Sequence, residues 1–494
     1  MYYENGSING YQNNSYSNSY DRKSGGRFNN FFEPPKKKRK IGRYLLLVLV
    51  IYYIVSSIID QEIFEGESPI VEFPEKQFWN LDDVVNIKIR DNKLIKSYKI
   101  TLYSSDSQSK VLEENSFENP TENFFEFNLT LPRVGSNFRD SSAKIVVEVE
   151  DASLLNMLSG NSTKQEFNLI IDQDIPKITV ISTSYGIRRG GSALVIFKVE
   201  EKNLKNITIK SNKSDKSFTP QPFLFKDRGY YASLVAWHVN DPTFSASIVA
   251  EDRAGNIEKR PLSLYLKEKK YKRSQITLRD KFLDGKITAL AKKHEKSSFT
   301  DSTLDFFKIV NEDMRKDNED LIHKITSEVD KNSVVNSFNI IPFKPLKGSI
   351  SVASFGDHRK FYYDGEFISE SYHLGLDLAS TRMAPVFSTN SGKIVFNDYN
   401  GVYGLSPIVS HGFGLYTIYS HCSTTSMIKV GDEISDHTVV GKSGVTGLAL
   451  GDHLHFGIYV QGIEVRPEEW MDKKWIKTNI VDVITSAKKI IERQ

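Results

Sequence analysis

The sequence predicts a mainly β, multidomain protein, and three observations carry that prediction. Most of the chain after residue 65 consists of short alternating runs of β-forming residues with turn signals between them. Residues 271–335 instead carry apolar residues at three- and four-residue steps, which is typical of helices. An apolar run near the N-terminus follows a basic cluster. We therefore expect a membrane helix, two β-sandwiches, a helical connector, an all-β domain and a terminal helix, in that order.

The N-terminal segment combines a polar tail with an apolar run. Residues 1–43 are rich in Asn, Ser, Tyr and Gly and end in PPKKKRKIGR, so we expect a disordered, basic cytoplasmic tail. Residues 44–60 begin YLLLVLVIYYIVSSII, which is near the lower limit for a transmembrane helix. The basic cluster places the N-terminus in the cytoplasm. A cleaved signal peptide fits less well because the run starts late and lacks a small-residue cleavage site. A nuclear localisation signal fits less well because the basic cluster adjoins an apolar span.

Overall composition excludes one class of protein. The 494 residues include 65 Lys and Arg against 62 Asp and Glu, a formal net charge of +3. This balance argues against a nucleic-acid-binding protein. The single cysteine, Cys422, cannot form an intramolecular disulfide, and its place at a strand end beside His421 indicates a packing residue and not a reactive nucleophile.

Residues 65–174 and 175–270 are predicted to be two β-sandwiches. The β runs that contain Asp151 and Asp252 stand about one sandwich-domain length apart, which suggests an internal repeat. The second run ends in AEDRAGN and resembles the ending of bacterial Ig-like modules. We interpret both modules as structural spacers, with ligand recognition as the alternative.

Two segments are expected to be helical. In the connector at 271–335, Ser302 and Asp305 resemble a capping box, and the heptad does not persist, so a packed connector is favoured over a coiled coil. The segment could also form a lid over a groove. Residues 476–494 should form an amphipathic helix with one apolar face: Ile476, Ile480, Ile484, Ala487 and Ile491.

The stretch GDHLHFGIYV holds two histidines, His453 and His455, one residue apart in a β run. Side chains at i and i+2 of a strand point to one face, with Cα atoms roughly 6–7 Å apart. Both imidazoles should therefore face one spot, and imidazole is both a zinc ligand and a general acid or base. Such a pair alone is weak evidence, since many are solvated surface residues.

A second stretch, SYHLGLDLAS, places His373 and Asp377 on the face opposite a row of leucines. A straight strand would separate them by roughly 13 Å, too far for one metal ion. We therefore expect the chain to bend at Gly375. The alternative is that Asp377 caps a turn while His373 bonds a loop carbonyl.

A third stretch, VSHGFGLYTIYSHCS, is typical of a hairpin whose turn runs from Gly412 to Gly414. His421 ends its second strand. His411 begins the turn and is interpreted as a turn-stabilising residue. Three separated segments thus supply the five candidate site residues: His373, Asp377, His421, His453 and His455.

Together, the patterns H-x-G-x-D-x-A, Tyr-x-His-x-Ser and G-D-H-L-H-F resemble the zinc metallopeptidases of the lysostaphin/LytM type, which cut peptide bonds in bacterial peptidoglycan. The resemblance covers roughly residues 340–475 and includes APVFSTNSGKIVF, a VGD and GKSGVTG. It implies an all-β domain with an antiparallel sheet and a duplicated hybrid motif. Cys422 stands where the family usually has Leu, and Gly457 where Glu is common, but neither position is a ligand.

By the family pattern, His373, Asp377 and His455 would bind Zn²⁺, and His421 and His453 would flank the attacking water. Two neutral imidazoles and one carboxylate leave the fourth zinc position open, as a catalytic site requires. Zinc in such a site activates water and polarises the scissile carbonyl. The two remaining histidines can accept the proton and stabilise the oxyanion, and the sequence does not assign these roles between them.

The resemblance implies a zinc metalloendopeptidase that hydrolyses the stems or cross-links of peptidoglycan during cell wall remodelling. The alternative is a non-catalytic LytM-like scaffold that binds and activates a separate amidase, and a weaker one is an adhesin built on the Ig-like modules. Expected partners are peptidoglycan, the inner membrane through the N-terminal helix, and a divisome or envelope protein, with no nucleic acid. We expect a single-pass bacterial inner membrane protein with a cytoplasmic N-terminus and a periplasmic or extracytoplasmic catalytic domain.

Overall fold

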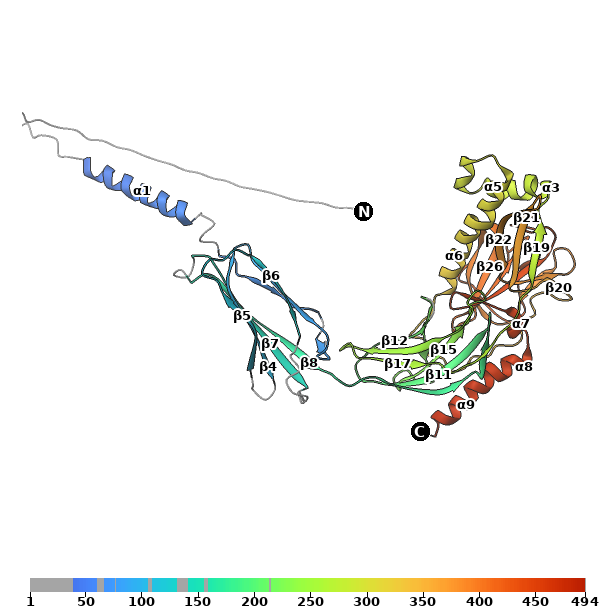
Figure 1. Ribbon diagram of the computed structural model, residues 1–494, viewed down its shortest axis with the longest axis horizontal. Helices are drawn as coiled ribbons and strands as arrows, with labels where there is room; N and C mark the ends of the chain where they lie inside the picture. Colours follow the sequence, from blue (N-terminus) through green and yellow to red (C-terminus); the bar gives the residue numbers. More distant parts are fainter. Residues whose placement is uncertain are drawn as a thin grey trace, which may run out of the picture. The chain divides into compact units, whose positions relative to one another are not determined.

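The computed structural model describes residues 39–59, 66–75, 77–104, 109–130, 141–154, 159–212 and 215–493 (Figure 1). These residues are mainly β, as predicted. The chain divides into two units, of which one contains the helix α1 and the other contains every strand and helix from β1 onward. Most of the predicted tail at residues 1–43 lies outside the described residues.

The apolar run near the N-terminus forms the helix α1 (Arg39–Ile59). Its large apolar side chains between Tyr44 and Val55 are exposed. No helix among the described residues has the length and apolar character needed to cross a membrane. The predicted helix at residues 44–60 is thus present up to residue 59, and residue 60 lies outside the described residues. The prediction that this helix spans a membrane is not supported.

Two sheets between residues 70 and 171 enclose a common apolar core. Their strand orders are β1-β3-β6 and β2-β8-β7-β4-β5. The alternation in β7 buries Ile145, Val147 and Val149, as the period of two in this segment predicts. The strands are β1 (Ile70–Glu72), β2 (Phe78–Trp79), β3 (Val85–Arg90), β4 (Ile95–Ser104), β5 (Ser109–Ser116), β6 (Phe124–Leu129), β7 (Ser142–Asp151) and β8 (Ser162–Ile171).

A second pair of sheets follows, with strand orders β14-β15-β11-β9 and β13-β12-β16-β17. The DRAGN sequence is a turn that the side chain of Asp252 closes, because its Oδ1 accepts hydrogen bonds from the backbone N–H groups of Gly255 at 2.7 Å and Asn256 at 2.8 Å. Each of the two predicted β segments forms a pair of sheets, while the domain boundaries and the Ig-like character stay predictions. The strands are β9 (Lys177–Thr183), β10 (Gly186–Arg188), β11 (Ser192–Glu200), β12 (Leu204–Ser211), β13 (Ser217–Phe218), β14 (Gln221–Pro222), β15 (Tyr230–Ala236), β16 (Ala246–Asp252), β17 (Ile257–Pro261) and β18 (Tyr265–Lys267).

The predicted connector begins with a strand and not a helix. β19 (Arg273–Thr277) pairs in parallel with β21, and helical structure starts only at Asp280. Half of the predicted capping box is present, since Ser302 Oγ accepts from the backbone N–H of Asp305 at 3.3 Å, while the Asp305 carboxylate accepts from Thr300 Oγ1 at 2.9 Å. The helices are α3 (Asp280–Phe282), α4 (Thr288–Ala291), α5 (Thr303–Lys308) and α6 (Arg315–Thr326), with π-helical turns at Leu283–Ile287 and at η4 (Ile309–Met314).

The C-terminal domain is built on an antiparallel sheet with the order β20-β23-β30-β27-β26-β25-β28, and β31 pairs with β30. The predicted hairpin is present as β26 and β27, with positive φ at Gly412, Phe413 and Gly414 in its turn. Smaller sheets are β24-β29 and β19-β21-β22. The strands are β20 (Ile350–Ala353), β21 (Asp357–Tyr363), β22 (Glu366–His373), β23 (Leu376–Ala379), β24 (Pro385–Ser388), β25 (Gly392–Asn400), β26 (Gly404–Ser410), β27 (Leu415–Ser420), β28 (Glu433–Ile434), β29 (Thr438–Lys442), β30 (Leu454–Val460) and β31 (Ile463–Val465).

One buried apolar cluster joins the second sandwich, the C-terminal domain and the helices that close the chain. The Trp470 indole N–H donates to Ser192 Oγ at 3.1 Å across this junction. The last helix lies beside β11 (Figure 1) and contacts both β9 and β11. Its residues Val483 and Ala487 are buried. These C-terminal helices are α7 (Pro467–Trp470), α8 (Lys473–Ile476) and α9 (Asp482–Ile491).

Candidate metal centre

Three strands bring the predicted ligand residues together. His373 ends β22, Asp377 lies in β23, and His455 lies in β30 directly opposite Asp377 in the antiparallel register. The chain bends between β22 and β23 as predicted. Gly375 is needed there because a Cβ would lie 2.6 Å from His455 Nε2 and 2.8 Å from the Phe456 carbonyl oxygen. The close approach of β30, and not a left-handed backbone, therefore explains this glycine.

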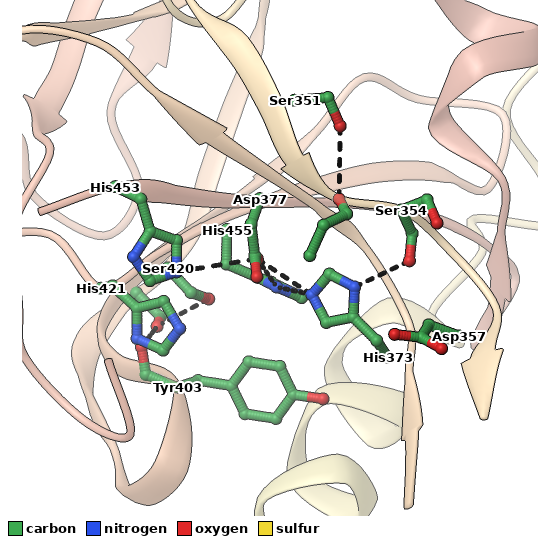
Figure 2. Close-up of polar contacts among 12 residues, drawn as sticks. Ser351, Ser354, Asp357, His373, Asp377, Tyr403, Ser420, His421, His453 and His455 are labelled. Atoms are coloured by element: carbon green, nitrogen blue, oxygen red, sulfur yellow. Dashed lines mark hydrogen bonds and ion pairs between the residues drawn. The ribbon is translucent and has the colours of Figure 1, made fainter. Parts of the chain in front are cut away.

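The ligand atoms of these three residues converge on one point (Figure 2). Asp377 Oδ1 lies 2.9 Å from His373 Nε2 and 2.9 Å from His455 Nδ1, and the two nitrogens are 3.1 Å apart. Both histidines are buried, and Asp377 is nearly so. The triangle of nitrogen, nitrogen and oxygen atoms is compact enough for a single ion to contact all three.

The proton positions on these rings favour a cation. His373 Nδ1 donates to the Ser354 carbonyl at 2.9 Å, which leaves a lone pair on Nε2 directed at Asp377 Oδ1. His455 Nε2 is buried without a hydrogen-bond partner, while its Nδ1 faces the same carboxylate oxygen. A ring nitrogen contacts a carboxylate oxygen favourably at this distance when a cation joins them, either a proton on the nitrogen or a metal ion. The mixed nitrogen and oxygen set, with a ring N–H of His373 bound to a carbonyl, fits zinc.

The protonation states of the centre match those of a metal site. Burial would raise the pKa of Asp377, but hydrogen bonds and charge from His373 and His455 lower that pKa well below its ordinary value. Burial lowers the pKa of His455 to about 4, against the opposing effect of Asp377. Near neutral pH the centre therefore presents a charged carboxylate and a neutral His455, which is the state that binds a cation.

The other two predicted residues lie beside this centre. His421 follows β27 with a φ of 64°, an uncommon conformation for a residue other than glycine, and its Nδ1 donates to the Thr446 carbonyl at 2.8 Å. His453 Nδ1 donates to the Gly451 carbonyl at 2.7 Å. Both rings thus keep a free lone pair on Nε2. The centroids of the two rings are 4.8 Å apart, and His453 Nε2 lies 3.7 Å from Asp377 Oδ1. The structure brings all five predicted residues together (Figure 2).

These five residues line one cavity with a volume of about 430 Å³, which is within the range of ligand-binding pockets. Exposed apolar residues stand in its wall, and Leu450 is 84% exposed. Burial lowers the pKa of His421 well below its ordinary value, and charge from His455 and His453 adds to this, so the ring is neutral near neutral pH. A neutral imidazole beside a metal centre in an open cavity can accept a proton from a reacting group.

Several contributors to the site carry no motif in the sequence. The Tyr403 ring meets His455 edge-on at 5.6 Å, and its hydroxyl donates to Glu319 at 3.4 Å. Arg315 and Arg359 also line the cavity, from α6 and β21. The carbonyl groups that orient the histidines belong to the backbone, so no residue type in the sequence identifies them.

Two other residues that the sequence singled out are structural, although the side chain of His411 bonds residues outside the predicted turn. His411 Nδ1 donates to the Ser391 carbonyl at 2.8 Å, and its Nε2 lies 2.9 Å from Thr417 Oγ1. Cys422 is fully buried with its thiol 3.2 Å from the Tyr419 carbonyl. Burial raises the pKa of this thiol to about 12, so the thiolate needed for nucleophilic attack is not formed.

A second group of carboxylates, Asp172, Glu201 and Asp252, also lies close together. Its oxygens already accept hydrogen bonds: Asp172 Oδ2 from the Asn203 amide at 2.7 Å, and Asp252 from the turn described above. This group has a structural explanation.

Two histidines and a carboxylate, flanked by two more histidines in a cleft, form a group that can hold a metal ion and leave one of its positions open. Residues 371–467 match the family model described as peptidase family M23. This segment is an M23 peptidase domain of the lysostaphin and LytM type.

The curated relatives are similar over this segment. The DD-carboxypeptidase/endopeptidase Mpg of Neisseria meningitidis is 33% identical over 95 residues, which cover 19% of this chain and 22% of that protein. Stage II sporulation protein Q of Bacillus subtilis is 34% identical over 103 residues, 20% of this chain and 36% of that protein. The peptidoglycan DD-endopeptidase ShyA of Vibrio cholerae is 32% identical over 90 residues, 18% of this chain and 21% of that protein. The chain thus spans about a fifth to a third of the length of these relatives.

Solved structures also align with the chain. A putative peptidase M23 from Pseudomonas aeruginosa has a TM-score of 0.35 at 18% identity and covers 57% of this chain and 93% of its own. The catalytic domain of lysostaphin from Staphylococcus simulans has a TM-score of 0.22 at 25% identity and covers 25% of this chain and 92% of its own.

Proposed function

We propose that the C-terminal domain is a zinc-dependent endopeptidase that hydrolyses peptide bonds in the stems or cross-links of peptidoglycan. The observation that carries this proposal is the convergence of His373 Nε2, Asp377 Oδ1 and His455 Nδ1 within 2.9 to 3.1 Å of one another. Two further histidines stand beside them with their Nε2 lone pairs free. Peptidoglycan as the substrate is supported by the names of the relatives ShyA and Mpg.

The chain's own residues have distinct tasks in this proposal. His373, Asp377 and His455 hold the zinc ion, which when bound activates water and polarises the scissile carbonyl. Either His421 or His453 can accept the one proton that the attacking water loses, at Nε2, because Nδ1 of each ring is already a donor to a carbonyl. Once protonated, either ring can donate a hydrogen bond to the oxyanion or a proton to the leaving amine.

The alternative function is a non-catalytic scaffold that activates a separate cell wall amidase. It would need the cleft as a binding surface but would leave the two positioned Nε2 lone pairs without a role. The complete set of five residues therefore favours the enzyme. A divisome or envelope protein remains a candidate partner in either case.

We also propose that the N-terminus is cytoplasmic and the catalytic domain periplasmic or extracytoplasmic. This rests on the basic cluster that precedes the apolar run. A reporter that is active only outside the cytoplasm, fused after Gln494, should be active. If that reporter were inactive and a cytoplasmic reporter fused at the same position were active, the proposed location would be wrong. The catalytic domain would then have no access to peptidoglycan.

Digestion of purified sacculi tests the function. The zinc-loaded full chain should release muropeptides in which a stem or cross-link peptide bond has been cut while the sugar remains attached. Mass spectrometry of the products identifies the bond. Chelated protein is the control. No release by the full chain, together with stimulation of an added amidase that frees whole stems from the glycan, would instead support the scaffold.

A further inference from the structure

The cleft contains an arginine that the catalytic proposal does not use. Arg315 is the first residue of α6 and lines the cavity that holds the metal centre. It also lines an adjoining cavity of about 300 Å³, and Ser371, Tyr372 and Leu374 line both cavities as well. Arg315 therefore stands where the two cavities adjoin, next to the strand that ends in His373.

The Arg315 guanidinium is only partly satisfied. One of its terminal N–H groups donates to Asn311 Oδ1 at 3.2 Å, while Nε is buried and has no hydrogen-bond partner in the described part of the chain. Among the described residues, no acidic side chain lies within the 4.0 Å of an ion pair with it. Burial raises the pKa of Glu319, one helical turn further on, to about 7, and the charge of Arg315 opposes this increase; Glu319 also accepts the Tyr403 hydroxyl at 3.4 Å. A buried donor without a partner calls for an explanation, and an absent ligand is one.

The other arginine of the cleft provides a contrast. Arg359 Nε lies 3.5 Å from Asp357 Oδ2, so this cation has its counter-charge on the same strand. The Asp357 carboxylate also accepts a hydrogen bond from Ser274 Oγ at 2.9 Å, which holds it in place. Of the two cleft arginines, only Arg315 has no carboxylate within 4.0 Å among the described residues.

The position of Arg315 is fixed relative to the metal centre. It directly follows the π-helical turn η4, and π-helical turns are frequent at functional sites. From this turn, the Asn311 amide donates to Ser369 Oγ at 2.9 Å and to the Glu370 carbonyl at 3.2 Å. Both acceptors lie in β22, whose last residue is His373. The arginine is thus held in place before any substrate arrives.

We propose that Arg315 binds a free carboxylate of the peptide substrate beside the scissile bond, which makes it a specificity-determining residue of the cleft. The planar guanidinium matches a carboxylate and donates two parallel hydrogen bonds to it. The helices at 280–326 then supply part of the binding site in addition to connecting two domains. The identity of the peptide rests on the proposed function. Peptidoglycan stems offer a carboxylate from two sources, the C-terminus and the side chain of a residue within the stem.

The test uses binding and requires no turnover. Calorimetric titration of the full chain, freed of zinc by chelation, compares three stem peptides: one with both carboxylates free, one with an amidated C-terminus and one with an amidated side-chain carboxylate. We expect one amidated peptide to bind about 10- to 100-fold more weakly than the free one, the loss of a charge-assisted hydrogen bond. The position of that amide identifies the source of the carboxylate.

Two substitutions separate Arg315 from the cleft as a whole. Arg315→Met should bind all three peptides equally weakly, and Arg315→Lys should recover part of the discrimination while keeping the charge. Arg279→Gln is the control and should discriminate as the wild type does, because Arg279 is exposed at the start of the same helical segment and lines neither cavity. Circular dichroism checks that each variant is folded. If Arg315→Met does not fold, the role of Arg315 is tested by the binding of the three peptides to the wild type and to Arg315→Lys.

Failure of this proposal is distinct from failure of the proposed function. Less than twofold discrimination by the wild type, no binding of the free peptide, or full discrimination by a folded Arg315→Met would each overturn the role of Arg315. Hydrolysis of the same peptides by the zinc-loaded chain is measured separately. If the peptides are cleaved but bind equally well, the proposed peptidase function stands and the carboxylate site at Arg315 is refuted. If the peptides are discriminated but not cleaved, the carboxylate site stands and the peptidase function is refuted.

Discussion

Nε2 of His373 lies 2.9 Å from Asp377 Oδ1 although the proton of that imidazole is on the opposite nitrogen, where it bonds the Ser354 carbonyl. A lone pair therefore faces a carboxylate oxygen inside a buried site. The contact is favourable when a second proton on the ring or a metal ion joins the two groups, and the convergence of His455 on the same oxygen supports the metal centre.

Metal removal is expected to abolish turnover without unfolding the domain. The purified full chain should hold about one zinc per chain, and chelation should remove the metal together with peptidase activity. The fold should survive because Asp377 and His455 are opposite partners in the β23–β30 ladder, which is hydrogen-bonded independently of the metal. Metal analysis, activity and circular dichroism measure the three quantities. Full turnover in a preparation without zinc would contradict the mechanism.

Substitution of Gly375 by Ala should disturb the metal centre from the backbone side. The new Cβ would lie within 2.8 Å of both His455 Nε2 and the Phe456 carbonyl, so β30 must shift. We expect a loss of about 1–3 kcal/mol in the free energy of unfolding and weaker zinc binding. Gly285→Ala is the control, since no atom lies within 4 Å of its added Cβ. If Gly375→Ala had the zinc affinity and stability of the wild type, the close approach of β30 would not be the reason for a glycine at this position.

The pH dependence of stability should include a contribution from His411. Burial lowers its pKa to about 4 from 6.5, so the unfolded chain binds a proton between these values while the folded chain does not. The contribution is therefore present above pH 6.5 and lost as the pH falls toward 4, with a total of about 3 kcal/mol. Denaturant unfolding of zinc-free wild type and His411→Gln, compared from pH 4 to 7, measures it. A difference between the two proteins that does not change with pH would refute this assignment.

The second sandwich and the C-terminal domain should unfold together. Trp470 is fully buried in their shared cluster and is hydrogen-bonded to Ser192 of β11. Trp470→Ala should lower the free energy of unfolding by about 3–5 kcal/mol. In calorimetry, both domains should unfold in one transition whose midpoint temperature is lower than in the wild type. Tyr185→Ala is the control, because Tyr185 is 76% exposed on the same sandwich. This substitution should change the free energy of unfolding by less than about 0.5 kcal/mol. Two separate transitions, with only one affected by Trp470→Ala, would contradict a shared core.

The sequence predicted the site well because its residues stand in strands, where a period of two decides which side chains share a face. This logic placed His453 beside His455 and required a bend between His373 and Asp377. The same local logic missed β19, since its polar sequence becomes a strand only by pairing with β21, about 80 residues away. It also missed Arg315, whose place in the cleft depends on how helices pack and not on any spacing.

The shared apolar core was likewise beyond local prediction. Ser192 and Trp470 are 278 residues apart in the chain, and neither belongs to a motif. Carbonyl groups such as those of Ser354 and Thr446 orient the histidines through backbone conformation, which side-chain identity does not encode.

Zinc content and peptide-bond hydrolysis, measured on the same preparations of His453→Ala and His455→Ala, test the central claim most directly. His455→Ala removes one of three ligands, so zinc content and turnover should both collapse. His453→Ala leaves the ligand set whole, so it should retain zinc near the wild-type level and lose a factor of about 10²–10⁴ in turnover, as expected when a positioned general acid or base is removed. Equal loss of zinc in both variants, or wild-type turnover in His453→Ala, would contradict the division of roles on which the proposed peptidase depends.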